Sequence, residues 1–398
     1  MLLRGLLSAA ALAASATAAF AAGCQKEPNF AAWLDGVRAE ALADGISQRA
    51  IDGALASVSF DPAIVKKDRA QGVFTQDFLQ FSDRMVAGYR LTQGKANIAK
   101  LKNTFAAIEK RFGVPAPVLT AYWGLETDFG AFMGDGDTLT SLATLAYGCR
   151  RPDLFRTQLI SALKIIDRGD LSPSDMRGPW AGELGQLQFI PERYWDYGVD
   201  FDGDGHVNML KSSADALASA ANYLQSIGWR RGEPWLQEVL VPGNLPWEQA
   251  DLTIKLPLSK WKAWGVTQAN GKALATNGPD ASLLLPVGRN GPAFLAYPNF
   301  DVYLVWNNSL VYSTTAAYFA TRLAGADKVS RGSGQDLLSV AEVREVQKLL
   351  AARGYDVGKV DGIIGQGTRA AVKDVQLKLG LPADSYPSKQ LLAKLRAG

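Results

Sequence analysis

The sequence is poor in the residues on which most metal and nucleophile chemistry depends. Its 398 residues include one histidine, His206, and two cysteines. A single imidazole excludes a multi-histidine metal site and disfavours the Ser-His-Asp and Cys-His hydrolases, which use histidine as general base. If the chain is an enzyme, we therefore expect carboxylates to carry its acid–base chemistry.

A strong net charge and long apolar runs are also missing. The net charge is +3, and the charged residues, 20% of the chain, are scattered, so no nucleic-acid partner is expected. After the N-terminal run at residues 6–20, no segment reaches about 20 uninterrupted apolar residues, so a transmembrane protein is not expected either. The 47% hydrophobic content is typical of a globular protein, and the length suffices for two or three domains.

The first residues predict export. Arg4 precedes the apolar run, and small residues follow it, so residues 1–23 have the order of a signal peptide. In an exported protein the two cysteines, Cys24 and Cys149, favour a disulfide. The alternative is a lipid anchor at Cys24, although Ala21 stands where a lipobox normally has leucine.

The residues that follow predict a mainly α fold. Apolar residues at three- and four-residue steps over 98–112 mark one face of a helix that Gly113 ends. The prolines at 115 and 117 suit the start of the next helix, and further helices are expected at 153–168 and 213–227. Between 237 and 312, short apolar runs broken by proline and glycine predict a small strand-containing subdomain.

The C-terminal residues read as a separate unit beyond a flexible linker at 330–336. Ser339 and Glu342 form a capping box, and Thr368 and Ser388 are candidate caps of two more helices. A three-helix unit over 337–398 is either a structural appendage or a binding module that tethers the preceding domain. Its position beyond a linker favours the binding module.

One carboxylate, Glu126, lies within the segment AYWGLETDFG at residues 121–130. Apolar neighbours remove hydration from a charged carboxyl and raise its pKa. An acid that stays protonated near neutral pH can donate a proton to a leaving group, as glycosidic-bond cleavage requires. A buried structural glutamate is the alternative. Asp128 lies two residues further on the same helix and therefore on another face, so it cannot be the partner of Glu126.

A second segment, WAGELGQLQFIP at residues 180–191, is the candidate wall of a site. Its glycines let a ligand approach the backbone, and Gln186 and Gln188 can hydrogen-bond sugar hydroxyls. Glu183 is a candidate second carboxylate. The alternative is a tight helix–helix contact with exposed glutamines.

At the start of residues 200–215, residues that can supply an oxygen ligand occur at every second position, as in an EF-hand-like calcium loop. The candidate ligands are Asp200, Asp202, Asp204, His206 through its backbone carbonyl, and Asp215. Gly205 permits the sharp turn. Lys211 stands at the twelfth position in place of a bidentate glutamate, so Asp215 would close a longer loop. A solvated acidic turn is the alternative.

Together these segments resemble the lytic murein transglycosylase B family. Residues 121–130 look like its catalytic helix, and residues 180–191 look like its GQxQFMP segment. The stretch GYDVGKVDGIIGQGTRAAV is similar to the peptidoglycan-binding domain often joined to these enzymes. The resemblance implies a lysozyme-like helical catalytic domain over 24–329, the linker at 330–336 and a peptidoglycan-binding domain over 337–398.

The resemblance also assigns roles to single residues. It implies that Glu126 is the sole catalytic carboxylate and that calcium, if bound in the 200–215 loop, is structural, with no cofactor needed for the chemistry. The residues implied to line the glycan cleft are Gln188, Tyr223, Asn307 and Tyr312. Pro179 replaces a serine of many members, which removes one hydrogen bond. The implied partners are peptidoglycan glycan strands and wall-synthesis or wall-remodelling complexes, in the periplasm.

The mechanism that the resemblance implies uses Glu126 twice. Glu126 protonates the β-1,4 oxygen between N-acetylmuramic acid and N-acetylglucosamine while the substrate's own N-acetyl carbonyl stabilises C1. The ionised Glu126 then accepts the proton of the C6 hydroxyl, and a 1,6-anhydromuramoyl end forms. The alternatives are a muramidase in which Glu183 activates water, and a non-catalytic peptidoglycan-binding protein.

Overall fold

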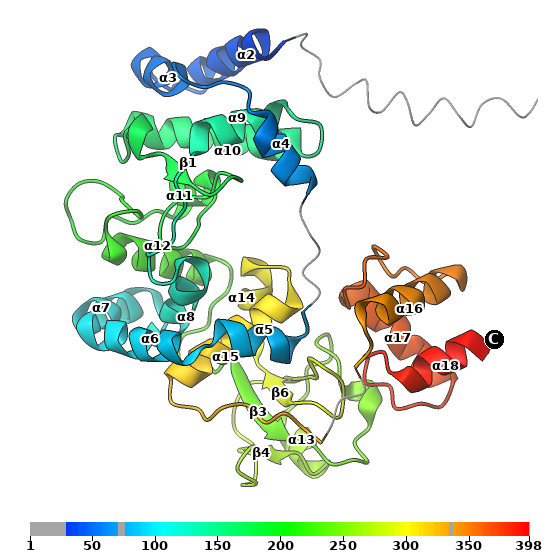
Figure 1. Cartoon of the computed structure of the whole chain (residues 1–398). Helices are drawn as coiled ribbons and strands as arrows, with labels where there is room; N and C mark the ends of the chain where they lie inside the picture. Colours follow the sequence, from blue (N-terminus) through cyan, green and yellow to red (C-terminus); the bar gives the residue numbers. More distant parts are fainter. Residues whose placement is uncertain (1–28, 71–75, 334–336, 398) are drawn as a thin grey trace, which may run out of the picture. The chain divides into compact units, whose positions relative to one another are not determined.

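The computed structural model describes residues 29–70, 76–333 and 337–397 (Figure 1). The chain forms two compact units, each built from two stretches of sequence. The first unit comprises residues up to 71 together with 130–219, and the second comprises 72–129 together with 220–398. The chain thus passes between the units at Phe129, three residues after Glu126.

The first unit is helical and is organised around one long helix. Its helices are α2 (Phe30–Ala43), α3 (Gln48–Leu55), α4 (Pro62–Arg69), α9 (Thr138–Tyr147), α10 (Pro152–Arg168) and α11 (Pro191–Tyr197). Helix α10 packs against α3, α9 and α11. Two short strands, β1 (Gly136–Asp137) and β2 (Arg177–Gly178), pair antiparallel. Helix α12 (Ser213–Ser226) runs from this unit into the second. The helices expected at 153–168 and 213–227 are confirmed to within one residue at each end.

Side-chain caps fix the starts of several of these helices. The residues that accept a backbone N–H of the first turn are Asn29, Ser47, Asp61 and Asp137. Such caps satisfy donors that an α-helix leaves without a partner. Cys149, in the turn between α9 and α10, is disulfide-bonded, whereas Cys24 lies outside the described residues.

The helices of the second unit include a largely buried one, α15 (Leu310–Leu323). The others before the C-terminal three helices are α5 (Phe78–Met85), α6 (Gly88–Lys100), α7 (Lys102–Phe112), α8 (Ala116–Thr127), α13 (Leu258–Ala263) and α14 (Pro298–Trp306). Helix α15 packs against α5, α6, α8 and α14. The single helix expected over 98–112 is wrong, because Leu101 leaves helical geometry and divides it into α6 and α7.

The strand-containing subdomain expected within 237–312 is confirmed as a four-stranded antiparallel sheet in the second unit. Its strands are β3 (Leu236–Leu240), β4 (Thr267–Gln268), β5 (Ser282–Leu284) and β6 (Ala293–Ala296), in the order β4-β3-β6-β5. Strands β5 and β6 are buried along their whole length. Trp261 of α13 is 0% exposed in their core, and its Nε1–H donates to the Ala281 carbonyl at 2.9 Å.

The C-terminal residues form three helices, α16 (Val340–Ala352), α17 (Gln366–Lys378) and α18 (Lys389–Ala397) (Figure 1). The capping box of Ser339 and Glu342 is confirmed, and Ser388 caps α18 by accepting the Leu391 N–H at 3.2 Å. The prediction that Thr368 is a cap is wrong. Thr368 is fully buried inside α17, where it accepts a hydrogen bond from Gln347 at 3.2 Å.

Among the described residues, no helix combines the length and apolar character needed to cross a membrane.

Trp261 provides a test of the sheet core. Because its side chain is fully buried and hydrogen-bonded, Trp261→Ala is expected to lower the free energy of unfolding by about 3–5 kcal/mol. Leu240→Ala is the matched control, since Leu240 lies on β3 of the same sheet but is 47% exposed, and it should change stability by less than about 0.5 kcal/mol. Urea unfolding measures both, and equal losses would contradict this core assignment.

Candidate active site

Helix α8 presents Glu126 from an otherwise buried segment. Within residues 118–127 every residue except Glu126 is buried, and Glu126 is half-buried. A helix that is apolar on all sides is a core helix, so its one half-exposed carboxylate is the group that can meet a ligand. The local sequence therefore places a single acid at the edge of the core.

The end of α8 is held in a sparsely populated backbone conformation. Asp128 and Phe129 have φ values of 53° and 63°, in the left-handed region that non-glycine residues rarely adopt. The Asp128 carboxylate accepts hydrogen bonds from Arg90 Nε at 3.0 Å and from the Tyr89 hydroxyl at 3.2 Å. These contacts from α6 hold the turn and engage the Asp128 carboxylate, which lies just after the last residue of α8.

Phe129 folds back against α8 and explains a glycine. A Cβ placed on Gly124 would lie 2.9 Å from Phe129 Cζ and 3.0 Å from Phe319 Cε1. A contact under about 3.0 Å requires the neighbours to shift, so only glycine fits there. The Phe129 ring also meets Trp123 edge-on, with ring centroids 5.6 Å apart. Trp123 and Phe129, two of the apolar residues near Glu126 in the sequence, thus pack on each other.

Two hydrogen-bond donors converge on one oxygen of Glu126. Trp306 Nε1 donates to Oε1 at 3.1 Å, and the Tyr312 hydroxyl donates to the same oxygen. Burial, followed by the charge and hydrogen bond of Glu126, raises the pKa of Tyr312 well above its usual value, so the phenol keeps the proton that it donates. Donors to a carboxylate favour its charged form. The expectation that the surroundings of Glu126 are purely apolar is therefore wrong at this oxygen.

A ladder of aromatic rings sets the position of Trp306 relative to α8. Tyr303 and Trp306 are three residues apart on α14, and Tyr122 of α8 inserts between them. The Tyr122 ring stacks on Tyr303 with centroids 5.2 Å apart and on Trp306 with centroids 4.2 Å apart. Because Tyr122 and Glu126 are four residues apart on one helix face, this stack brings the Trp306 indole level with the Glu126 carboxylate.

The junction between α14 and α15 is tied by short polar side chains. Ser313 Oγ lies 2.7 Å from the Asn307 carbonyl oxygen and 2.9 Å from that of Tyr303. Asn307 Oδ1 accepts the Ser309 N–H at 2.9 Å, and Ser309 Oγ accepts the Tyr312 N–H at 3.3 Å. This network fixes the turn between the two helices that supply Trp306 and Tyr312.

The structure brings together three of the residues expected around the glycan within the second unit. Tyr312 contacts Glu126 directly, and Tyr223 of α12 lies against Trp306 with ring centroids 5.8 Å apart. Asn307 follows Trp306 and has its side chain in the turn. The sequence analysis missed Trp306. The signal that points to it is the three-residue spacing of Phe300, Tyr303 and Trp306, which gives α14 one aromatic face.

Gln188 belongs to the first unit and lies in a tight turn rather than in a helix. Leu184 and Phe189 exchange backbone hydrogen bonds of 2.7 and 2.9 Å, and Gln188 has a φ of 52°. Its Nε2 donates to the Gly185 carbonyl at 2.9 Å. The alternative of a helix–helix contact at residues 180–191 is wrong.

The other polar residues of this segment differ in their surroundings. Gln186 donates to the Leu210 carbonyl at 3.2 Å and accepts the Ser213 hydroxyl at 3.0 Å, so it ties the turn to the following residues. Burial raises the pKa of Glu183, and its Oε2 is buried with no hydrogen-bond partner among the described residues.

Three of the expected calcium ligands lie together in the first unit. Carboxylate oxygens of Asp200, Asp202 and Asp204 are all within 4.8 Å of one another. The loop is already shaped by its own hydrogen bonds, because Asp200 accepts the Gly203 and Gly205 N–H groups at 2.7 and 2.9 Å. A cluster of carboxylate oxygens suits a hard cation such as calcium, so these residues fit the ion.

Asp215 is placed differently from the other expected ligands. It is fully buried, and its two oxygens accept the backbone N–H groups of Phe201 at 2.9 Å, Asp202 at 3.3 Å and Asn208 at 2.8 Å. It therefore braces the loop backbone and lies outside the acidic group. Lys211, at the twelfth position, pairs with Asp175 at 2.9 Å.

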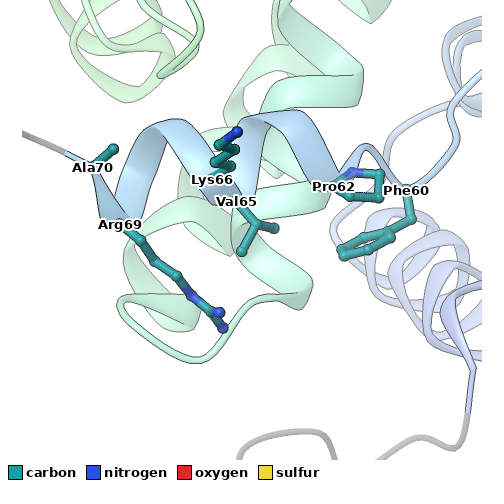
Figure 2. Close-up of a pocket in the computed structure, with 6 residues that line it drawn as sticks. All are labelled: Phe60, Pro62, Val65, Lys66, Arg69 and Ala70. Carbon is teal, nitrogen blue, oxygen red and sulfur yellow. The ribbon is translucent and has the colours of Figure 1, made fainter.

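A hollow of about 460 Å³ lies elsewhere on the first unit, along α4 (Figure 2). It is lined by Phe60, Pro62, Val65, Lys66, Arg69 and Ala70. It contains none of the residues that the sequence indicated, so the candidate chemistry does not lie there.

Comparisons with known families match two parts of the chain. Residues 29–321 match the transglycosylase SLT domain, and residues 339–395 match the putative peptidoglycan binding domain. The chain belongs to the transglycosylase SLT family. The expected mainly helical, lysozyme-like fold with a C-terminal helical domain is confirmed by the solved relatives of this family.

Two relatives of this SLT-family chain are named as lytic proteins of murein and of spore cortex. Membrane-bound lytic murein transglycosylase B of Escherichia coli is 34% identical over 204 residues, which is 51% of this chain and 55% of that protein. The chain thus spans little more than half the length of this relative. A spore cortex-lytic enzyme of Bacillus cereus is 40% identical over 70 residues, which is 17% of this chain and 25% of that enzyme.

Solved structures extend the similarity over most of the chain. SltB3 of Pseudomonas aeruginosa, in complex with NAG-anhNAM-pentapeptide, is 42% identical with a TM-score of 0.86, covering 93% of this chain and 100% of that one. The Escherichia coli lytic transglycosylase Slt35, in complex with calcium, is 25% identical with a TM-score of 0.62, covering 75% of this chain and 93% of that one.

The buried Asp215 yields a prediction on loop stability. An amide has one acceptor oxygen where the carboxylate has two, so Asp215→Asn leaves a backbone N–H without its partner. We expect a loss of about 2–3 kcal/mol in the free energy of unfolding, measured in urea with excess chelator present. Asp204→Asn is the matched control, because Asp204 is exposed and accepts one backbone N–H, from His206 at 2.9 Å. A loss at Asp215 no larger than at Asp204 would contradict the bracing role.

Proposed function

We propose that this chain is a lytic murein transglycosylase that cleaves the β-1,4 bond between N-acetylmuramic acid and N-acetylglucosamine and leaves 1,6-anhydromuramoyl ends. Family membership and the similarity to SltB3, whose solved structures hold NAG-anhNAM- and NAG-NAM-pentapeptide, support this proposal. The observation that carries it is Glu126, a lone half-buried acid on a buried helix with two donors aimed at one oxygen.

Glu126 acts first as acid and then as base in this proposal. Its proton passes to the glycosidic oxygen as the bond from that oxygen to C1 breaks, and the substrate's N-acetyl carbonyl oxygen stabilises C1. The C6 oxygen then attacks C1, and its proton returns to the Glu126 carboxylate. No water is consumed, and Glu126 ends in the protonated form in which it began.

A second carboxylate is unnecessary for this route. Asp128, the nearest acid in the sequence, is paired with Arg90 and Tyr89 at the end of α8, so it does not serve as base for a water molecule. The muramidase alternative would instead need Glu183. Its raised pKa is compatible with acid–base work, which keeps product analysis as the deciding experiment.

The remaining assignments follow from this activity. We propose that Gln188, Tyr223, Asn307 and Tyr312 contact the glycan, and that Tyr312 also acts through its hydrogen bond to Glu126.

We propose that the chain is divided into a signal peptide at 1–23, a catalytic domain at 24–329, a linker at 330–336 and a wall-binding domain at 337–398. The disulfide at Cys149 is typical of an oxidising compartment and supports export to the periplasm.

We also propose a structural calcium ion in the acidic loop. The ion would be held by Asp200, Asp202 and Asp204 together with the backbone carbonyl of His206. Asp215 would support the loop through its hydrogen bonds to the loop backbone. The ion would supply no chemistry to the reaction, since it would only fix the loop.

Product analysis tests the activity. Purified peptidoglycan is treated with wild type, Glu126→Gln and Glu109→Gln, and the released muropeptides are measured by mass spectrometry. We expect anhydro products from wild type and a loss of rate of roughly 10²–10⁴-fold in Glu126→Gln, because the amide cannot donate an acidic proton. Glu109 is an exposed residue of α7 in the same unit, so Glu109→Gln should retain full activity.

The other outcomes identify the alternatives. Products heavier by one water would indicate a hydrolase and direct attention to Glu183. Wild-type protein that is folded and binds peptidoglycan but releases no product would support the non-catalytic binding protein.

Calcium binding has its own test. A ligand that binds only the folded state stabilises it by about 2.7 kcal/mol at 100 times its Kd, so calcium should raise the Tm by several degrees relative to chelator. Asp200→Asn combined with Asp204→Asn should remove the shift, whereas Asp153→Asn, at an exposed site on α10 of the same unit, should retain it. Identical melting curves with calcium and with chelator would refute the site.

A further inference from the structure

The indole of Trp306 makes a polar contact with the proposed acid that no sequence motif indicated. Its Nε1–H lies 3.1 Å from Glu126 Oε1, although the two residues are 180 positions apart in the chain. Tyr312 donates to the same oxygen from the start of α15. Oε1 is therefore the acceptor of two donors that come from two different helices.

Two other aromatic rings contact the Trp306 ring. Tyr122 stacks on it with centroids 4.2 Å apart and an angle of 29° between the planes, and Tyr223 lies against it with centroids 5.8 Å apart. These contacts leave the edge that carries Nε1–H as the part directed at Glu126.

We propose that Trp306 is a positioning residue that, together with Tyr312, fixes the Glu126 carboxylate through Oε1 and stabilises its charged form. A protonated oxygen is a poorer acceptor than a charged one, and placing the proton on Oε1 would weaken two hydrogen bonds at once. This inference rests on the proposed transglycosylase activity and adds to it a residue that positions the acid.

The direction of the pH effect follows from the same contacts. The N–H of Trp306 stabilises the charged carboxylate, so its removal raises the pKa of Glu126. The first step needs protonated Glu126, so the alkaline limb of kcat/KM should move to higher pH by about one to two pH units.

The ionisable groups near Glu126 do not obscure the shift of the alkaline limb of kcat/KM. Those of the second unit that the structure describes include Tyr122 on α8, Tyr303 on α14, Tyr312 on α15, Tyr223 on α12, and the Arg90–Asp128 pair between α6 and the end of α8. Burial raises the pKa of Tyr122, Tyr303 and Tyr312 well above the usual value for tyrosine. The Arg90 and Asp128 charges lie 3.0 Å apart and largely cancel at a distance.

The test compares Trp306→Phe with Trp235→Phe on a soluble glycan of defined length. Phenylalanine keeps a ring in the Tyr122 stack but removes the N–H, so we expect the shifted alkaline limb with KM within about twofold of wild type. Trp235 is the matched control. Its Nε1–H donates to the Ala317 carbonyl of α15 at 3.1 Å in the same unit, so Trp235→Phe loses an indole hydrogen bond without touching Glu126.

A measurement without turnover keeps the inference testable if Trp306→Phe is inactive. The titration of Glu126 is followed by NMR in protein labelled with ¹³C at the glutamate carboxyl, with Glu126→Gln used to assign the signal. A higher midpoint in Trp306→Phe, and a similar rise in Tyr312→Phe, would support the proposal. If wild type forms anhydro products but neither the alkaline limb nor the midpoint moves, this inference is wrong and the proposed activity stands. If wild type forms none, the activity itself is wrong.

Discussion

The insertion of the Tyr122 ring between Tyr303 and Trp306 is the contact on which the site depends. It joins α8 to α14 at a defined height, because a displacement of one residue along either helix would separate the rings. Stacked aromatic pairs contribute about 0.5–1.5 kcal/mol beyond the area they bury. The stacking stabilises the fold and also sets the register of α8 against α14. This register matters for the site because the same face of α8 carries Glu126.

The two units use carboxylates in opposite ways. In the second unit a half-buried carboxylate receives donors from side chains and stays at the edge of the core. In the first unit Asp215 is fully buried and receives donors from the backbone, which makes it a fixed part of a loop. The two carboxylates thus differ in which groups donate to them and in how much solvent reaches them.

The sequence was sufficient for the features that depend on local pattern. Helix α10, the capping box of α16 and the acid on α8 follow from periodicity, cap residues and the segment around Glu126. It was insufficient where distant parts decide the outcome. Leu101 interrupts an apolar period that looks continuous, and Thr368 resembles a cap but is buried by the helix opposite it.

The environment of the acid was the largest difference between expectation and structure. The segment 121–130 predicts apolar surroundings, but the groups that reach the Glu126 carboxylate lie 180 and 186 residues further along the chain. Nothing in the local sequence encodes such partners, because they depend on how α14 and α15 pack against α8. The three-residue spacing of aromatic residues on α14 is the feature of the sequence that indicates this packing.

The left-handed residues at the end of α8 limit how this protein can be stabilised. Non-glycine residues in that region cost about 1–3 kcal/mol each, and here two follow in direct succession. Glycine at 128 would relieve the backbone but discard the contacts to Arg90 and Tyr89 that hold the turn. Stabilising substitutions are therefore better sought away from this turn, where the strained backbone and the side-chain contacts that hold it belong to the same residue.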